Sequence, residues 1–354
     1  MNERIVKVGL IGYGFGGRIF HAPILTSVPG LKLEKIYETK PDNIADIKKK
    51  YPEANVINQV EDIFNDKEIE LVVVATPNQF HFEYAKKAME SGKHVIVEKP
   101  FTITSKEADE LIKISQTTGK LLTVNHNRRW DSDFKTVVSV IKSNLLGEVI
   151  EFESHYDRFS SEAGDNWRVQ KSSPGSGMLY DLGSHLIDQA LFLFGLPQEV
   201  FGYVDKQRTH TEVDDCFEVI LRYPGLKVTL KSGMLIQEKG PHYCVHGRNG
   251  SFVKYGLDIQ EDELIKGKIP NECSDWGREP EELYGKLNTL VNGVHMIGNV
   301  ESETGDYRSL YRNLYDAILG KEELAVKAQQ ARNTIRVIEL ASQSNEERRW
   351  VPFE

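Results

Sequence analysis

Asp181 and His185 are four positions apart in an apolar stretch that the sequence predicts to be helical. Residues with this spacing lie on one face of a helix, so the two side chains can meet. Histidine can take a hydroxyl proton near neutral pH, and a neighbouring carboxylate can orient its ring and stabilise its charged form. A surface ion pair or a hydrogen-bonded core histidine would explain the same spacing. The pair is therefore a candidate acid–base site.

Lys99 is the second candidate, because it lies between Glu98 and Pro100 directly after a predicted buried strand. Ligands of open parallel sheets bind outside the carboxyl ends of the strands. An ammonium there could hold a substrate hydroxyl and stabilise the alkoxide that develops as a hydride leaves. Pro100 favours an extended backbone at Lys99, which fixes its direction. A surface lysine at a strand end is the alternative.

Two further clusters combine polar and aromatic residues. The first follows the last strand of the N-terminal half and contains His126, Asn127 and Arg128. The second contains Tyr156, Trp167 and Arg168. Side chains at a carboxyl strand end face the ligand cleft, although a solvated turn between domains is an equal alternative. Aromatic faces with arginine partners suit sugars and cyclitols, and they suit an interface as well.

Gly12, Gly14 and Gly17 match the dinucleotide-binding pattern G-x-G-x-x-G. The pattern follows a predicted strand and precedes a helix, as that reading requires. The three glycines would permit a tight turn, close approach of the backbone to a pyrophosphate, and close packing of the helix. The helix N-terminus would offer free N–H groups to the phosphates. A glycine-rich turn without a ligand is the alternative.

Glu38 ends the second predicted strand, about 20 residues after the glycines, where a ribose-binding acid is expected. A carboxylate there would accept the ribose hydroxyls and repel a 2′-phosphate, which favours NAD. Thr39 and Lys40 could hold that phosphate instead if Glu38 turned away, which favours NADP. The sequence leaves both cofactors open.

Short apolar strands alternate with helical stretches up to about residue 124. The predicted strands are 6–11, 33–37, 71–75, 94–97 and 121–124, and the predicted helices are 45–51, 81–90 and 105–118. Ser105 is the expected N-cap of the last helix, and Gly92 and Gly119 are expected stops. Strands that are apolar on both faces and alternate with helices form a parallel sheet covered on both sides. Residues 1–124 are therefore predicted to form a Rossmann domain.

After residue 124 the pattern changes to longer strands with tight turns. The predicted helices are 131–145, 178–194 and 328–346, and the predicted strands are 148–159, 200–207, 217–223, 227–236, 243–246 and 350–353. Hairpin turns are expected at 224–225 and 249–250. Residues 125–354 are therefore predicted to form an α/β domain with an open, mostly antiparallel sheet and helices on one face. The last helix could pack back on the first domain.

Composition narrows the function classes. A chain of 354 residues predicts two domains, and 40% hydrophobic with 27% charged residues indicates a folded protein. A net charge of -9 without a basic run argues against a nucleic-acid surface or an anionic membrane. No apolar run approaches the roughly 20 residues of a spanning helix. Three scattered cysteines and no secretion signal predict no metal site, no disulfide framework and a cytoplasmic location.

Together these segments resemble the Gfo/Idh/MocA oxidoreductases over essentially the whole chain. The matching segments are residues 12–17, 75–78 (ATPN), 94–100 (HVIVEKP) and 180–188 (YDLGSHLID). Within the family the chain is most similar to the bacterial scyllo-inositol dehydrogenase subgroup. That similarity rests on residues 20–23 (FHAP), 125–133 (NHNRRWDSD), 253–258 (VKYGLD) and 276–277 (WG).

The resemblance implies a Rossmann domain plus an α/β domain, with Lys99, Asp181 and His185 as the catalytic set. The cofactor-binding residues that it implies are Gly12, Gly14, Phe15, Gly16, Gly17, Glu38, Thr39, Lys40, Thr76, Pro77, Asn78, His81, Glu98 and Lys99. The candidate substrate-binding residues are His126, Asn127, Arg128, Tyr156, Trp167 and Arg168.

The expected activity is the reversible, NAD- or NADP-dependent oxidation of one secondary hydroxyl of a cyclitol or sugar to a ketone. His185 would take the hydroxyl proton, Asp181 would orient His185, and Lys99 would hold the reacting oxygen. Two alternatives on this fold are an NAD-dependent glycosidase and a non-enzymatic dinucleotide sensor. A homo-dimer or homo-tetramer formed through the C-terminal sheet is expected, because open sheets are commonly covered by another subunit.

Overall fold

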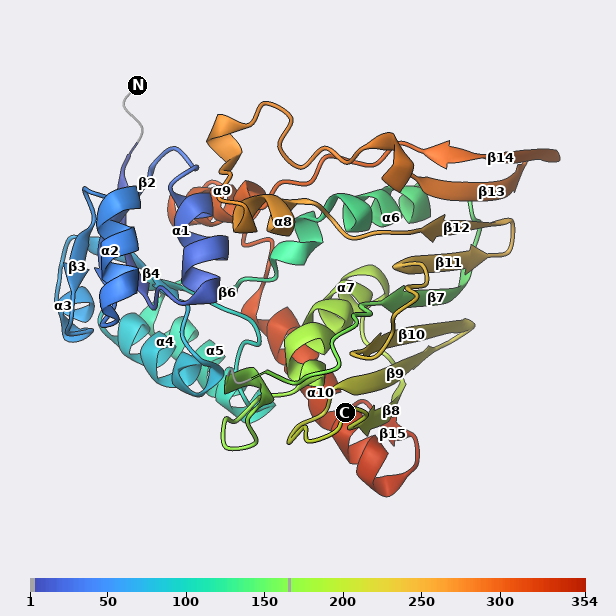
Figure 1. Ribbon diagram of the computed structural model, residues 1–354, viewed down its shortest axis with the longest axis horizontal. Coiled ribbons are helices and arrows are strands. Elements are labelled where there is room, and N and C mark those ends of the chain that lie inside the picture. The colour runs from blue at the N-terminus through green and yellow to red at the C-terminus, as the bar shows by residue number, and fades with distance from the viewer. Residues whose placement is uncertain (1–3, 165–166) are drawn as a thin grey trace. The chain divides into compact units, whose positions relative to one another are not determined.

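The computed structural model describes residues 4–164 and 167–354, and the chain divides into two compact units (Figure 1). Unit 1 comprises Met1–Asn127, Gln260–Trp276 and Tyr307–Arg332. Unit 2 comprises Arg128–Ile259, Gly277–Asp306 and Asn333–Glu354. Unit 1 is thus completed by two segments that come late in the sequence.

Unit 1 contains a six-stranded parallel sheet with the order β3-β2-β1-β4-β5-β6. Its strands are β1 (Val6–Ile11), β2 (Leu31–Tyr37), β3 (Asn55–Ile57), β4 (Ile69–Val74), β5 (His94–Val97) and β6 (Leu122–Val124). The central strands are almost wholly buried, as their continuous apolar runs predict. The predicted Rossmann fold is confirmed. The strand β3 was not predicted, because it is short and only one of its residues is buried.

Two helices of unit 1 match the predicted residues, α4 (His81–Glu90) and α5 (Ser105–Thr118), and α2 (Pro41–Lys50) overlaps the predicted helix 45–51. The helices α1 (Ala22–Leu25), α3 (Glu61–Phe64), α8 (Gln260–Ile265) and α9 (Arg308–Ile318) had no predicted range. The N-cap of α5 is Thr104 and not the predicted Ser105, because Thr104 and Glu107 form a reciprocal capping box. Gly119 ends α5 with a left-handed backbone, as expected. Helix α4 packs against α5 and against β4 and β5 (Figure 1).

Unit 2 contains a nine-stranded sheet with the order β14-β13-β12-β11-β7-β10-β9-β8-β15 (Figure 1). Its strands are β7 (Val149–His155), β8 (Glu199–Asp205), β9 (Cys216–Tyr223), β10 (Leu226–Gly233), β11 (Tyr243–Gly247), β12 (Gly250–Lys254), β13 (Gly285–Val291), β14 (Val294–Val300) and β15 (Val351–Pro352). All neighbours are antiparallel except β7 and β10. This confirms a mostly antiparallel sheet. One hairpin turn lies at the predicted 224–225, and the other lies at 248–249, one residue before the predicted 249–250, because Gly250 already pairs with Thr289.

One face of this sheet is covered by the helices α6 (Ser132–Lys142), α7 (Ser184–Phe194) and α10 (Ala328–Glu347). On that face, the residues that pair across neighbouring strands are buried in each of the strands β8, β9, β10, β11 and β12. The hairpin of β13 and β14 was not predicted. The strand β14 is exposed on both faces, so its sequence lacks the alternation that marks a half-buried strand.

The turn after β1 leaves almost no space for side chains at two of its three patterned glycines. A Cβ atom at Gly12 would lie 2.5 Å from the carbonyl oxygen of Ala75, and its φ of +96° is unfavourable for other residues. A Cβ atom at Gly17 would lie 2.1 Å from the carbonyl oxygen of Gly12. At Gly14, by contrast, a Cβ atom would meet nothing within 4 Å.

Gly17→Ala should therefore lower the free energy of unfolding by about 1–3 kcal/mol, because the backbone must shift to admit the methyl group. Gly14→Ala is the matched control and should leave stability within about 0.5 kcal/mol of the parent chain. Urea unfolding followed by circular dichroism measures both changes. Equal midpoints for the two variants would contradict the packing described for Gly17.

Candidate active site

The parallel alignment of the six strands in unit 1 brings the candidate cofactor-binding segments to one edge of the sheet. Gly12–Gly17 follow β1, Glu38–Lys40 follow β2, Thr76–Asn78 follow β4, Glu98 and Lys99 follow β5, and Asn125–Asn127 follow β6. The strand order reverses direction between β1 and β4, and ligands of open α/β sheets bind at such a point. The predicted cofactor-binding residues therefore lie at the edge of the sheet where a ligand is expected.

The residues of this edge fit a dinucleotide. The open space at Gly14 leaves room for close approach of a pyrophosphate to the backbone. The hydroxyl of Thr76 is buried and has no hydrogen-bond partner within residues 4–164 and 167–354, so it is available to a ligand. Phe15 exposes 43% of its surface beside the glycines. Pro77 and Asn78 continue the turn that begins at Thr76.

His81 lies in the interior of unit 1 and not at its surface. Its two ring nitrogens contact the carbonyl oxygens of Thr76, at 3.0 Å, and Pro100, at 2.9 Å. Burial lowers the pKa of this imidazole. The ring thus joins the turn after β4 to the turn after β5, where the Lys99–Pro100 peptide bond is cis.

The Glu38 carboxylate is engaged by its own loop. One oxygen accepts hydrogen bonds from the backbone N–H groups of Thr39, at 2.7 Å, and Lys40, at 2.9 Å. The other accepts a hydrogen bond from the side-chain amide of Asn43 at 2.7 Å. Glu38 is buried, whereas Thr39 and Lys40 are exposed. The carboxylate therefore stabilises the start of α2, and the two exposed side chains are left at the surface of the loop.

In unit 2, Asp181 and His185 belong to one continuous helical segment, as predicted. Asp181 lies in a π-helical turn (η5, Leu179–Gly183) that leads directly into α7, which contains His185. Single π turns are frequent at functional sites. The Asp214 carboxylate accepts a hydrogen bond from the backbone N–H of Leu179 at 2.8 Å, which stabilises the start of this turn. His185 is buried within the unit.

The substrate-binding candidates of unit 2 form two groups. The Arg168 guanidinium lies 4.7 Å from the centre of the Trp167 ring and 3.7 Å from an Asp181 oxygen. The Arg128 guanidinium lies 5.1 Å from the centre of the Tyr156 ring, which is buried. The remaining candidates, His126 and Asn127, are buried in unit 1.

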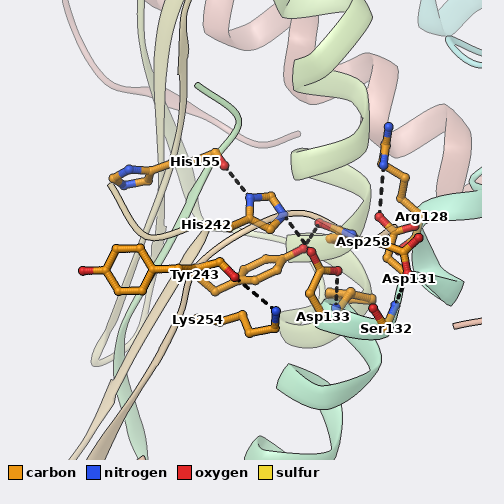
Figure 2. A network of polar contacts seen from close by, with 12 residues as sticks. Arg128, Asp131, Ser132, Asp133, His155, His242, Tyr243, Lys254 and Asp258 are labelled. Carbon is orange, nitrogen blue, oxygen red and sulfur yellow. Dashed lines mark hydrogen bonds and ion pairs between the residues drawn. The ribbon is translucent and has the colours of Figure 1, made fainter. Parts of the chain in front are cut away.

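A buried network of charged residues between α6 and the sheet was not predicted (Figure 2). Lys254 and Glu279 are fully buried and form an ion pair at 2.9 Å. Asp258 accepts a hydrogen bond from the backbone N–H of Ser132 at 2.7 Å. Lys254 occupies a register that alternation assigns to the apolar face of β12, so hydrophobic patterning could not find this network.

Asp133 and His242 face each other in this network, with 3.5 Å between the Asp133 Oδ2 and His242 Nε2 atoms (Figure 2). The His242 Nδ1 atom donates to the carbonyl oxygen of His155, so Nε2 carries the lone pair in the neutral ring. A carboxylate opposite a lone pair is unfavourable, so one proton is shared at this contact. Burial, with the charge of Asp258, raises the pKa of Asp133 to about 7, and burial lowers the pKa of His242 to about 3. The proton therefore resides on Asp133.

Asp133→Asn should remove a pH dependence of stability. The folded chain holds a proton on Asp133 up to about pH 7, whereas an unfolded aspartate loses it near pH 3.8. The contribution of Asp133 to the free energy of unfolding is full below pH 3.8 and is lost as the pH rises towards 7. Because the variant lacks this loss, its free energy of unfolding should rise relative to that of the parent chain by on the order of 3 kcal/mol between these pH values.

Urea unfolding of both chains between pH 4.5 and about 7.5 measures this difference. Both chains retain His242, whose opposite pH dependence cancels in the comparison. The asparagine amide can still donate to His242 Nε2, so folding is preserved. A difference in unfolding free energy that stays constant with pH would contradict a protonated Asp133.

Within residues 4–164 and 167–354, no group of three or more His, Cys, Asp or Glu side chains could hold a metal ion. In the same residues, no helix combines the length and the apolar character needed to span a membrane. The three cysteines are free thiols. The cytoplasmic location stays a prediction.

Comparison with known proteins shows two family matches that cover most of the chain. Residues 6–126 match the NAD-binding Rossmann fold of the Gfo/Idh/MocA oxidoreductase family, and residues 138–353 match the C-terminal alpha/beta domain of that family. The chain is 39% identical over 349 residues to scyllo-inositol 2-dehydrogenase (NADP(+)) IolW of Bacillus subtilis, covering 99% of this chain and 96% of IolW. It is 42% identical to the oxidoreductase YdgJ of Escherichia coli, covering 97% of each chain.

Solved structures agree with these matches. The structure of YvaA from Bacillus subtilis superposes with a TM-score of 0.95 at 38% identity and covers 100% of both chains. An oxidoreductase from Bacillus cereus superposes with a TM-score of 0.90 at 32% identity and covers 99% of both chains. With the glycine turn, the Rossmann strand order and the second α/β sheet, these matches show that the chain belongs to the Gfo/Idh/MocA family of NAD(P)-dependent oxidoreductases.

Proposed function

We propose that this enzyme reversibly oxidises one secondary hydroxyl of a cyclitol, of the scyllo-inositol type, to a ketone. The observation that carries the substrate class is the match to IolW over 99% of this chain. The pair of Arg168 with Trp167 in unit 2, which is partly exposed, supports a polyhydroxylated substrate, because aromatic faces beside polar groups suit sugar rings and hydroxyls.

Lys99, Asp181 and His185 are the proposed catalytic residues. His185 takes the hydroxyl proton, and the Asp181 carboxylate orients and stabilises the resulting imidazolium. The Lys99 ammonium holds the reacting oxygen and stabilises its developing negative charge. Arg168 places a positive charge 3.7 Å from an oxygen of that carboxylate. When bound at the edge of unit 1, the nicotinamide cofactor supplies the hydride acceptor.

Lys99→Ala and His185→Ala should each lower kcat by at least about 100-fold, because each removes a group that acts on the reacting hydroxyl. Dinucleotide affinity, measured by fluorescence titration, should change less than about threefold. Steady-state formation of reduced dinucleotide with scyllo-inositol measures turnover. Lys113→Ala is the matched control, because this side chain is exposed outside the site and its loss should leave turnover unchanged.

Parent-like turnover in either catalytic variant would overturn its assigned role. The parent chain also separates the alternative functions. Cleavage of a glycosidic bond without net formation of reduced dinucleotide would indicate an NAD-dependent glycosidase on the same fold. Dinucleotide binding without turnover of any polyol or glycoside would indicate a sensor.

NADP is the proposed cofactor. Recognition of NAD needs a carboxylate that is available to the ribose hydroxyls, and the Glu38 carboxylate already accepts three hydrogen bonds from its own loop. The exposed Thr39 hydroxyl and Lys40 ammonium are suited to a 2′-phosphate. IolW, by name, uses NADP(+).

Lys40→Ala should therefore lower kcat/KM for NADP by about tenfold, which equals about 1.4 kcal/mol. The kcat/KM for NAD should change little. Lys50→Ala, which removes another exposed lysine of unit 1, should change neither value. Glu38→Gln should preserve the preference for NADP, because its amide oxygen can still accept from the loop. A parent chain that prefers NAD, or a selective loss of NAD turnover in Glu38→Gln, would contradict this assignment.

A homo-oligomer formed through the C-terminal sheet is also proposed. The strand β14 lies at the edge of that sheet and exposes Val294, Met296 and Ile297, each by more than half. Exposed apolar strands at a sheet edge are commonly covered by a second subunit. Sedimentation velocity measures the oligomeric state.

A further inference from the structure

Four buried residues from separate segments of unit 1 form a chain of contacts that ends at the backbone of Lys99. His21 ends the helical turn after the glycines (η1, Gly17–His21), Glu98 follows β5, Asn125 follows β6, and Tyr311 lies on α9. Each is at most 9% exposed. Tyr311 comes 290 positions after His21 in the sequence. The two residues meet because α9, which contains Tyr311, packs against α1, which begins directly after His21 (Figure 1).

The Glu98 carboxylate is held by three donors. Its Oε1 atom accepts hydrogen bonds from His21 Nε2 and from Asn125 Nδ2, both at 2.9 Å. Its Oε2 atom accepts a hydrogen bond from the backbone N–H of Lys99 at 2.8 Å. Burial alone would raise the pKa of Glu98, but hydrogen bonds from His21 and Asn125 and the charges of His21 and Lys99 lower it to about 2. Glu98 is therefore an ionised carboxylate that fixes the backbone at Lys99.

Tyr311 determines which nitrogen of His21 faces Glu98. An ionised carboxylate only accepts hydrogen bonds, so His21 Nε2 must carry a proton. The other ring nitrogen, Nδ1, is within hydrogen-bond distance of the Tyr311 hydroxyl. The tyrosine hydroxyl donates to this nitrogen when the ring is neutral and accepts from it when the ring is protonated. In either case the contact holds the ring in the orientation that points Nε2 at Glu98.

We propose that His21 and Tyr311 are positioning residues for Lys99, acting through the Glu98 carboxylate. This inference rests on the proposed catalytic role of Lys99. The chain of contacts runs from the Tyr311 hydroxyl to the His21 ring, to Glu98, and to the backbone N–H of Lys99. The direction of Lys99 therefore depends on a residue that comes late in the chain.

Tyr311→Phe is the central test, because it removes the hydroxyl and keeps the buried ring. Its kcat should fall about tenfold, since small displacements of a catalytic group are costly, while dinucleotide affinity stays unchanged. Tyr315→Phe is the matched control on the same helix. It also removes a buried hydroxyl hydrogen bond, but that bond goes to the carbonyl oxygen of Arg4 and not to His21, so kcat should stay unchanged.

A second readout does not depend on activity. The rate at which an amine-acylating reagent modifies Lys99 is measured by mass spectrometry in the absence of dinucleotide, with the exposed Lys49 of the same sample as reference. Release of Lys99 should raise its relative rate severalfold in Tyr311→Phe and His21→Leu. His21→Gln keeps an N–H donor for Glu98 and should recover part of the parent behaviour.

The two proposals can fail separately. If the parent chain turns over no polyol, the catalytic role of Lys99 fails, and the labelling rates still decide whether His21 and Tyr311 position it. If Tyr311→Phe and Tyr315→Phe match each other in kcat and in Lys99 labelling, the positioning role is overturned. If Tyr311→Phe does not fold, the comparison of His21→Gln with His21→Leu decides the same question.

Discussion

The common direction of the six strands in unit 1 is the constraint on which the candidate active site depends. Parallel strands end at one edge, so segments far apart in the sequence meet there. Each of these segments begins where a buried apolar strand stops. The tight glycine turn after β1 and the buried His81 ring then hold neighbouring loops in place.

Buried ionisable groups also fix the structure, and neighbouring groups set the charge state of each one. Glu98 is kept ionised by donors, whereas Asp133 is kept protonated by burial and by neighbouring carboxylates. The same side-chain chemistry thus takes opposite charge states in the two units. Such groups are costly to bury unless they are satisfied, so they specify one arrangement of the elements around them.

The sequence predicted the Rossmann sheet well, because its strands are continuous apolar runs and its helices have clear ends. It also placed Asp181 and His185 on one helical segment. It could not reveal the tie between His21 and Tyr311, since nothing local links positions 290 residues apart. Lys254 was missed because a buried ammonium breaks the apolar alternation of its strand. The role of Glu38 depended on side-chain direction, which spacing does not determine.

The central claim is that a hydride passes from a ring carbon of a cyclitol to the cofactor. The most direct test supplies scyllo-inositol deuterated at its ring carbons together with NADP and determines the mass of the reduced dinucleotide. The account predicts one deuterium in each reduced dinucleotide and an equal amount of ketone. Unlabelled dinucleotide, or product formed without net reduction of the cofactor, would contradict it.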